Sequence, residues 1–100
     1  LFVSGQVPFN PETMEIVEGG VKEQTAQSLR NVEAILKEVG LDFSNVVKST
    51  VFIKDMNEFA QINEVYSEFF KENKPARACV EVARLPRDAR VEIEVIAVFE

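Results

Sequence analysis

Two stretches of the sequence repeat their apolar residues at intervals of three and four positions, the spacing of one face of an α-helix. The first begins at Val21 and stops at Gly40, a residue type that commonly ends helices. The second follows Asp55 and Glu58, which have the spacing of a helix-capping box, and ends near Pro75. Because each stretch has a single apolar stripe, both helices need another surface to pack against, and the sequence predicts a sheet beneath them.

The segments around these helices alternate between apolar and polar residues, as strands with one buried face do. We expect strands over residues 1–7, 14–17, 45–54, 76–83 and 90–100. The order β-β-α-β-α-β-β predicts an α+β fold, in which one mixed sheet carries both helices on one face. Residues 1–100 contain no linker or internal repeat, so we expect a single domain.

The other face of this sheet is left uncovered by the helices. In the 45–54 strand, the covered face is expected to carry Val47, Ser49, Val51 and Ile53. The alternation places four apolar and three charged residues on the uncovered face: Phe52, Cys79, Ile96, Val98, Arg77, Glu92 and Glu94. Such a face is too apolar for water and too charged for an ordinary core, so a subunit partner is expected to cover it.

Composition excludes several classes of function. The chain has no His and one Cys, which excludes a Ser-His-Asp or Cys-His nucleophile, a metal site built on His, a thiolate cluster and an intrachain disulfide. A net charge of −6 disfavours a nucleic-acid partner. No apolar run approaches the roughly 20 residues that span a bilayer, so no membrane partner is expected. The lone thiol fits a reducing compartment, and we expect a cytoplasmic protein.

Charged side chains on the last two predicted strands are the strongest candidates for chemistry. Arg77 and Cys79 share one face of the first strand, and Glu92 and Glu94 share one face of the second. If these strands pair, a guanidinium that can clamp a small carboxylate faces an acid that can hold a water or exchange a proton. The spacing alone favours a plainer interpretation, a cross-strand ion pair that fixes register. Likewise, Cys79 is more typical of a small buried hydrophobe than of a nucleophile.

Three further positions have two interpretations each. Ser4 and Gly5 are typical of a bulge, but their backbone N–H groups could also grip an anion. Asn63 lies beside the apolar stripe of the second helix, where it could cap a backbone group or reach a ligand. Tyr66 is expected in the core with its hydroxyl at the edge. The Arg84–Arg90 segment, with acids nearby, indicates a solvated turn rather than an RNA contact.

These residues resemble the RidA family of reactive intermediate deaminases, formerly called YjgF. The segment Pro75–Pro86, followed by Val91–Ala97, is similar to the family's C-terminal signature. Ser4–Pro8 is similar to its early Ser-Gly-Gln motif, and Ser28–Val32 and Val47–Phe52 to its first helix and central strand. The resemblance covers essentially all 100 residues.

The resemblance implies a chorismate-mutase-like fold and a homotrimer with ligand clefts between subunits. It also implies hydrolysis of reactive 2-imino acids, such as 2-iminopropanoate from 2-aminoacrylate and 2-iminobutanoate, to 2-oxo acids and ammonia. By resemblance, Arg77 binds the substrate carboxylate, Glu92 positions water, and Ser4, Gly5, Asn63 and Cys79 line the pocket. Glu94 is the competing choice for the acid. No metal or organic cofactor is needed in this scheme.

The sequence departs from the family's pattern at one place. Relatives have a preceding strand and a Gly-Pro-Tyr segment whose Tyr lines the cleft, and nothing here corresponds to them. Because the chain begins with Leu1 inside an apparent strand and without Met, we expect that an N-terminal segment is missing. Two alternatives to the deaminase remain open: a non-catalytic module that binds small carboxylate metabolites, and an endoribonuclease or translation inhibitor.

Overall fold

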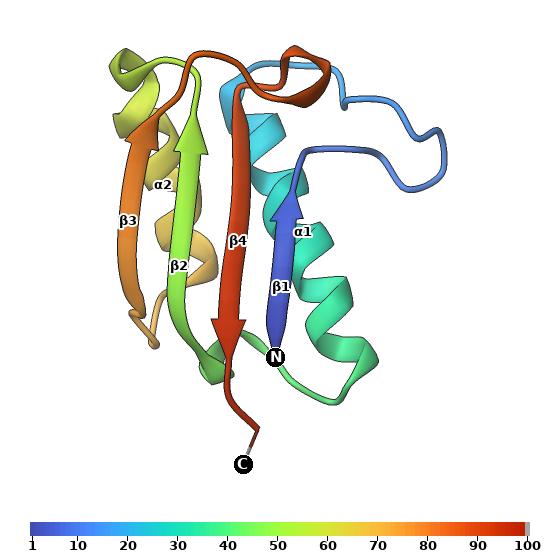
Figure 1. The fold of residues 1–100 in the computed structure, drawn as a ribbon, viewed down its shortest axis with the longest axis vertical. Coiled ribbons are helices and arrows are strands. Elements are labelled where there is room, and N and C mark those ends of the chain that lie inside the picture. The colour runs from blue at the N-terminus through green and yellow to red at the C-terminus, as the bar shows by residue number, and fades with distance from the viewer. Residues whose placement is uncertain (100) are drawn as a thin grey trace.

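The computed structural model describes residues 1–99 and shows two layers, a four-stranded sheet and two helices that cover one of its faces (Figure 1). The strand order is β1-β4-β2-β3, with β3 parallel to β2 and the other neighbours antiparallel. This confirms the expected α+β fold with a mixed sheet. The elements are β1 (Phe2–Gln6), α1 (Val21–Glu38), β2 (Val46–Ile53), α2 (Phe59–Phe69), β3 (Ala76–Glu81) and β4 (Val91–Ala97). None of the helices described is long and apolar enough to span a membrane.

The strand expected over residues 14–17 is not formed. The structure has a single isolated bridge there, between Phe9 and Ile16, inside a long loop that projects beyond the sheet (Figure 1). Side chains in this loop bind its own backbone: the amide of Glu12 donates to Asn10, and the amide of Glu15 donates to the hydroxyl of Thr13. Such local bonds compete with a strand ladder. The order among residues 1–99 is therefore β-α-β-α-β-β.

The core lies between the helices and the covered face of the sheet, as the two apolar stripes predict. Its largest fully buried side chains come from both layers: Leu29, Val32, Leu36, Ile62, Val51, Ile53, Val91 and Ile93. One prediction for β2 was wrong, because Val47 is 46% exposed while Val46 is buried. The pairing of β2 with β4 shifts register between Val46 and Lys48, and this irregularity turns Val46 instead of Val47 toward the core.

The last two strands do not pair with each other, and Arg77 and Cys79, which were expected on the uncovered face, lie on the covered one. β3 pairs with β2 in parallel, and β4 lies on the other side of β2. The physical reason is the crossover through α2, which returns the chain in the direction of β2 and so places β3 beside that strand. Arg77 is therefore opposite Ser49, on the covered face, while Glu92 is opposite Phe52, on the uncovered one.

The side chain of Asn73 stabilises the turn that leads into β3. The side-chain amide of Asn73 donates to the backbone carbonyls of Phe43 and Val46, at 2.8 and 3.0 Å. We expect Asn73→Ala to lower the free energy of unfolding by about 1–3 kcal/mol, because two carbonyls lose their donor. Thermal unfolding would show a fall of roughly 4–8 °C per kcal/mol. The control Asn57→Ala, at an exposed position, should melt within about 3 °C of the wild type.

Candidate functional site

Arg77 projects from edge strand β3 toward α2, where three side chains hold its guanidinium. Its Nη1 donates to Oδ1 of Asn63 at 2.7 Å. The guanidinium carbon lies 4.8 Å from the ring centre of Tyr66 and 5.5 Å from that of Phe59. Arg77 itself is exposed, so its remaining N–H groups can reach a ligand. The structure thus gives Asn63 a partner that the sequence did not suggest. It binds Arg77 and orients its guanidinium, and it also lines a hollow beside that residue.

A hollow of about 390 Å³ opens beside this arginine, between α2 and the start of β3. Its lining includes two buried aromatic residues and two exposed cationic ones: it is formed by Asn63, Tyr66, Ser67, Phe70, Lys74, Pro75 and Arg77. A planar guanidinium at the rim of a partly apolar hollow is suited to a small organic acid, which it binds through two parallel charge-assisted bonds.

Cys79 lies two residues along β3 on the same side of the sheet and packs against the core. Burial raises the pKa of its thiol, and the positive charge of Arg77 opposes that shift only in part. A thiol with a raised pKa is mostly protonated at neutral pH and is a weak nucleophile. The interpretation of Cys79 as a small, partly buried hydrophobe is thus favoured over a catalytic role.

Glu92 lies on the uncovered face of the sheet, against the backbone of β1. The pairing of β1 with β4 is irregular between Val3 and Gln6, so Ser4 and Gly5 form the bulge that the sequence suggested. A Cβ atom added to Gly5 would be 2.1 Å from Oε2 of Glu92, so the carboxylate rests directly on this glycine. Burial, and to a lesser extent the charge of Glu94, raises the pKa of Glu92.

The structure therefore brings the predicted site residues together in two separate groups. Asn63, Arg77 and Cys79 lie on the helix side of β3, whereas Ser4, Gly5 and Glu92 lie on the open side of β1 and β4. β2 separates the strands of Arg77 and Glu92, so the condition for the guanidinium and the acid to face each other across a strand pair is not met. Both groups fit one substrate only if a second copy of the chain supplies one of them.

Sequence reasoning missed the part played by Tyr66. The residue is buried in the core as predicted, but its hydroxyl points inward and pairs with the hydroxyl of Ser49 at 2.5 Å. Ser49 gave a usable signal, since a hydroxyl among valines and isoleucines on the core face of a strand needs a buried partner. The aromatic contact of Phe59 with Arg77 had no comparable signal.

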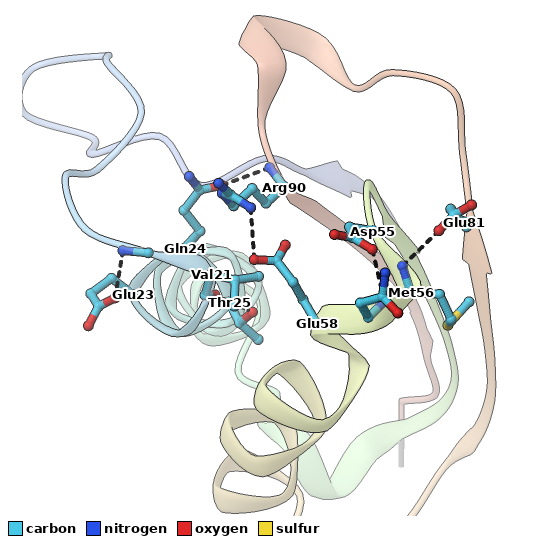
Figure 2. A network of polar contacts seen from close by, with 11 residues as sticks. Val21, Glu23, Gln24, Thr25, Asp55, Met56, Glu58, Glu81 and Arg90 are labelled. Atoms are coloured by element: carbon cyan, nitrogen blue, oxygen red, sulfur yellow. Dashed lines mark hydrogen bonds and ion pairs between the residues drawn. The ribbon is translucent and has the colours of Figure 1, made fainter.

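Two arginines near the start of β4 are paired with acids, whereas Arg87 in the same segment lies over the ring of Phe9, 5.9 Å from its centre. Figure 2 shows Arg90 with its side chain on Glu58, at 2.7 Å, and its backbone amide on Gln24, at 2.8 Å. Arg84 is paired with Asp88, also at 2.7 Å. The two ion pairs agree with the solvated turn that the sequence indicated, because they occupy two guanidinium groups that could otherwise contact a phosphate backbone. Within residues 1–99, no three His, Cys, Asp or Glu side chains group as a metal site requires.

Replacing Gly5 tests the contact with Glu92. Gly5 does not have a left-handed backbone, so a side chain at this position conflicts only with the side chain of Glu92, which would have to move. We expect Gly5→Ala to displace the Glu92 carboxylate by about 1 Å and to lower the kcat of a reaction that uses it by about 10²-fold. The matched control is Gly20→Ala, because a Cβ there meets its nearest neighbour at 3.6 Å. Equal activity of both variants would contradict the prediction.

Comparisons with known proteins identify the family of the chain. The sequence pattern of the family described as endoribonuclease L-PSP matches residues 1–99. A RutC family protein of Pyrococcus abyssi is 56% identical over 100 residues, which are 100% of this chain and 79% of that protein. The human 2-iminobutanoate/2-iminopropanoate deaminase is 47% identical over 98 residues, covering 98% of this chain and 72% of the human one.

A solved structure is similarly close. Escherichia coli TdcF with bound serine superposes with a TM-score of 0.94 at 51% identity, over 99% of this chain and 80% of TdcF. The fold, the motifs around Arg77 and Glu92, and the length of the match all point the same way. The chain belongs to the endoribonuclease L-PSP family, which includes the RidA, YjgF and RutC proteins that its motifs resemble.

Proposed function

We propose that this protein hydrolyses small 2-imino acids, such as 2-iminopropanoate and 2-iminobutanoate, to 2-oxo acids and ammonia. The observation that carries the proposal is Arg77, an exposed guanidinium that Asn63 and two aromatic rings hold at the rim of a hollow. A fixed guanidinium with free N–H groups is the group that selects a small carboxylate. Relatives at 47–51% identity that carry the name 2-iminobutanoate/2-iminopropanoate deaminase support the choice of substrate.

The reaction is proposed to take place between copies of the chain. Arg77 and Glu92 emerge on opposite sides of the sheet, so one substrate can contact both only where two copies meet. The uncovered face presents Phe2, 81% exposed, and Val80, 42% exposed, together with the half-buried Phe52 and Ile96. Exposed apolar area of this kind indicates an interface. The family resemblance implies a homotrimer, and we adopt that assembly.

In the proposed mechanism Arg77 clamps the carboxylate of a protonated imino acid, and this fixes the C=N carbon beside a water on Glu92 of another copy. The water oxygen bonds to the carbon while Glu92 accepts a proton from the water. That proton then passes from Glu92 to the amino nitrogen. As the C–N bond breaks and ammonia leaves, Glu92 accepts the proton of the new hydroxyl group, whose oxygen becomes the carbonyl oxygen of the 2-oxo acid. A protonated imine is already a good electrophile, so positioning supplies most of the catalysis.

The raised pKa of Glu92 sets the pH dependence of this scheme. Glu92 must be ionised to accept a proton, so kcat/KM should fall as the pH drops through the pKa of Glu92, which lies above the ordinary value of 4.5. Glu94→Gln removes the neighbouring negative charge and should move this acidic limb to lower pH. The test is to measure kcat/KM as a function of pH for the wild type and for Glu94→Gln. An unmoved limb would assign the titration to another group.

A single set of assays distinguishes the proposed deaminase from two other candidate functions. A non-catalytic module that binds small carboxylates is favoured by the serine bound to TdcF, and an endoribonuclease by the family's description. The chain is incubated with freshly generated 2-aminoacrylate, with serine and with a single-stranded RNA. Release of ammonia and pyruvate above the rate in water supports the deaminase. Serine binding without turnover supports the module, and RNA cleavage lost in Arg77→Ala supports the nuclease.

A further inference from the structure

The interior beneath Arg77 contains a hydroxyl pair that fixes the position of one aromatic ring. Ser49, on β2, is fully buried, and its Oγ lies 2.5 Å from the hydroxyl of Tyr66 on α2. A buried hydroxyl without a partner is costly, so each of these two groups depends on the other. Tyr66 is only 7% exposed, and its ring stacks on that of Phe70 with the centres 4.6 Å apart. The ring of Tyr66 is thereby fixed in the core.

The outer face of the ring of Tyr66 carries the guanidinium of Arg77, whose carbon is 4.8 Å from the ring centre. Phe59, about two turns earlier on α2, lies at 5.5 Å from the same carbon. Asn63, between these two on the helix, adds the hydrogen bond to Nη1 at 2.7 Å. Positions 59, 63 and 66 are spaced by four and three residues, so one face of α2 presents all three side chains to Arg77.

We propose that Tyr66 and Phe59 form an aromatic seat that positions Arg77 to receive the substrate carboxylate. The two rings limit the tilt of the guanidinium plane, because the cation is attracted to the ring faces. Asn63 limits its rotation within that plane, because the hydrogen bond has a preferred direction. Tyr66 and Phe59 are thus positioning residues that act through Arg77, and this inference rests on the proposed function.

The aromatic seat is expected to improve ligand affinity because Arg77 projects from an exposed edge strand. A long side chain at such a place samples many rotamers, and binding a ligand then requires that they be frozen. Holding the guanidinium in advance removes this cost from the binding step and improves affinity for the carboxylate. The benefit is the same for the substrate and for the 2-oxo acid product, since both present a carboxylate. Loss of the seat should therefore appear in KM and product affinity more than in kcat.

The test compares three variants in the assembled protein. Tyr66→Leu removes the ring face, Tyr66→Phe keeps it and removes only the hydroxyl, and Phe59→Leu removes the more exposed ring. KM and kcat are measured on 2-aminoacrylate, and calorimetry gives the Kd of 2-oxobutanoate. The matched control is Phe43→Leu, which removes an aromatic contact with Phe70, 4.9 Å away, that does not involve Arg77. Melting temperatures report on the fold of each variant.

We expect Tyr66→Leu to raise both KM and the Kd of 2-oxobutanoate by about 3- to 30-fold, with kcat within about threefold of wild type. Phe59→Leu should raise both by about 2- to 5-fold, because its ring is farther from the cation. Tyr66→Phe should melt at a lower temperature but keep KM and Kd within about twofold, since the ring face remains. Phe43→Leu should behave in the same way, with a lower melting temperature and unchanged affinity.

Three outcomes would overturn the aromatic seat. An unchanged KM and Kd in a folded Tyr66→Leu would do so, as would an equal loss of affinity in Tyr66→Phe, which keeps the ring. If Tyr66→Leu fails to fold, an unchanged Kd in Phe59→Leu decides against it. Failure of the proposed function has a different signature: the wild type itself would then release no ammonia from 2-aminoacrylate above the rate in water. An activity that requires Arg77 but not the rings refutes the seat alone.

Discussion

Arg77→Ala is expected to lower kcat/KM for 2-aminoacrylate by about 10²- to 10⁴-fold. Each hydrogen bond from a charged donor to a carboxylate contributes about 1.5–3 kcal/mol, and the fork of Arg77 supplies two. Arg77 is exposed and forms its bond with Asn63 at the surface, so its loss should leave the melting temperature within a few degrees of wild type. Steady-state release of ammonia measures the effect.

The loss should follow from the guanidinium at this position rather than from the removal of any positive charge. Arg84→Ala is the matched control, because Arg84 is also an exposed arginine with one side-chain partner, Asp88, and lies outside the hollow. We expect it to retain wild-type activity. Arg77→Lys keeps the charge but loses the planar fork, and it should show a loss intermediate between wild type and Arg77→Ala. Wild-type activity in a folded and assembled Arg77→Ala would remove Arg77 from the mechanism.

Periodicity alone predicted the layers of this fold. The stripes on the two helices and the alternation in β2 and β4 come from the burial of one face, and burial of one face is what a hydrophobic pattern records. The pattern failed where local geometry decides: Val46 replaces Val47 in the core because of a register irregularity in β2. The alternation of apolar and polar residues does not indicate where such a shift in register occurs. The loop around Ile16 failed for a similar reason, since side-chain bonds replaced the ladder.

The candidate site was predicted as a set of residues but not as an arrangement. Arg77 and Glu92 carry chemistry that is evident from residue type, and motif resemblance selected them among many charged residues. Their relative placement depends on which strands are neighbours, and the sequence of one strand does not indicate which other strand will pair with it. The βαβ crossover places β3 beside β2, and the register of that pair, with Arg77 opposite Ser49, puts Arg77 and Glu92 on opposite faces.

Because Arg77 and Glu92 lie on opposite faces of the sheet, a mixture of two inactive variants should regain activity. Arg77→Ala and Glu92→Gln should each lose nearly all activity, because each lacks one half of the site. When the two are unfolded, mixed in equal amounts and refolded together, every cleft draws Arg77 from one chain and Glu92 from its neighbour. The chance that both are intact is one half times one half. The mixture should therefore recover about a quarter of the activity of wild type refolded in the same way.

Refolding controls make this recovery specific to sites shared between chains. Each variant refolded alone should stay inactive, and the two mixed without unfolding should gain activity only as fast as subunits exchange. A chain that carries both substitutions, mixed equally with wild type, provides the matched comparison. Shared sites would leave about a quarter of the clefts intact in that mixture, whereas sites within single chains would leave about half. An inactive Arg77→Ala and Glu92→Gln mixture, beside a wild type that refolds fully, would show that no site combines Arg77 of one chain with Glu92 of another. The opposite faces of the sheet would then need another explanation, because the geometry of one chain keeps the guanidinium and the carboxylate apart.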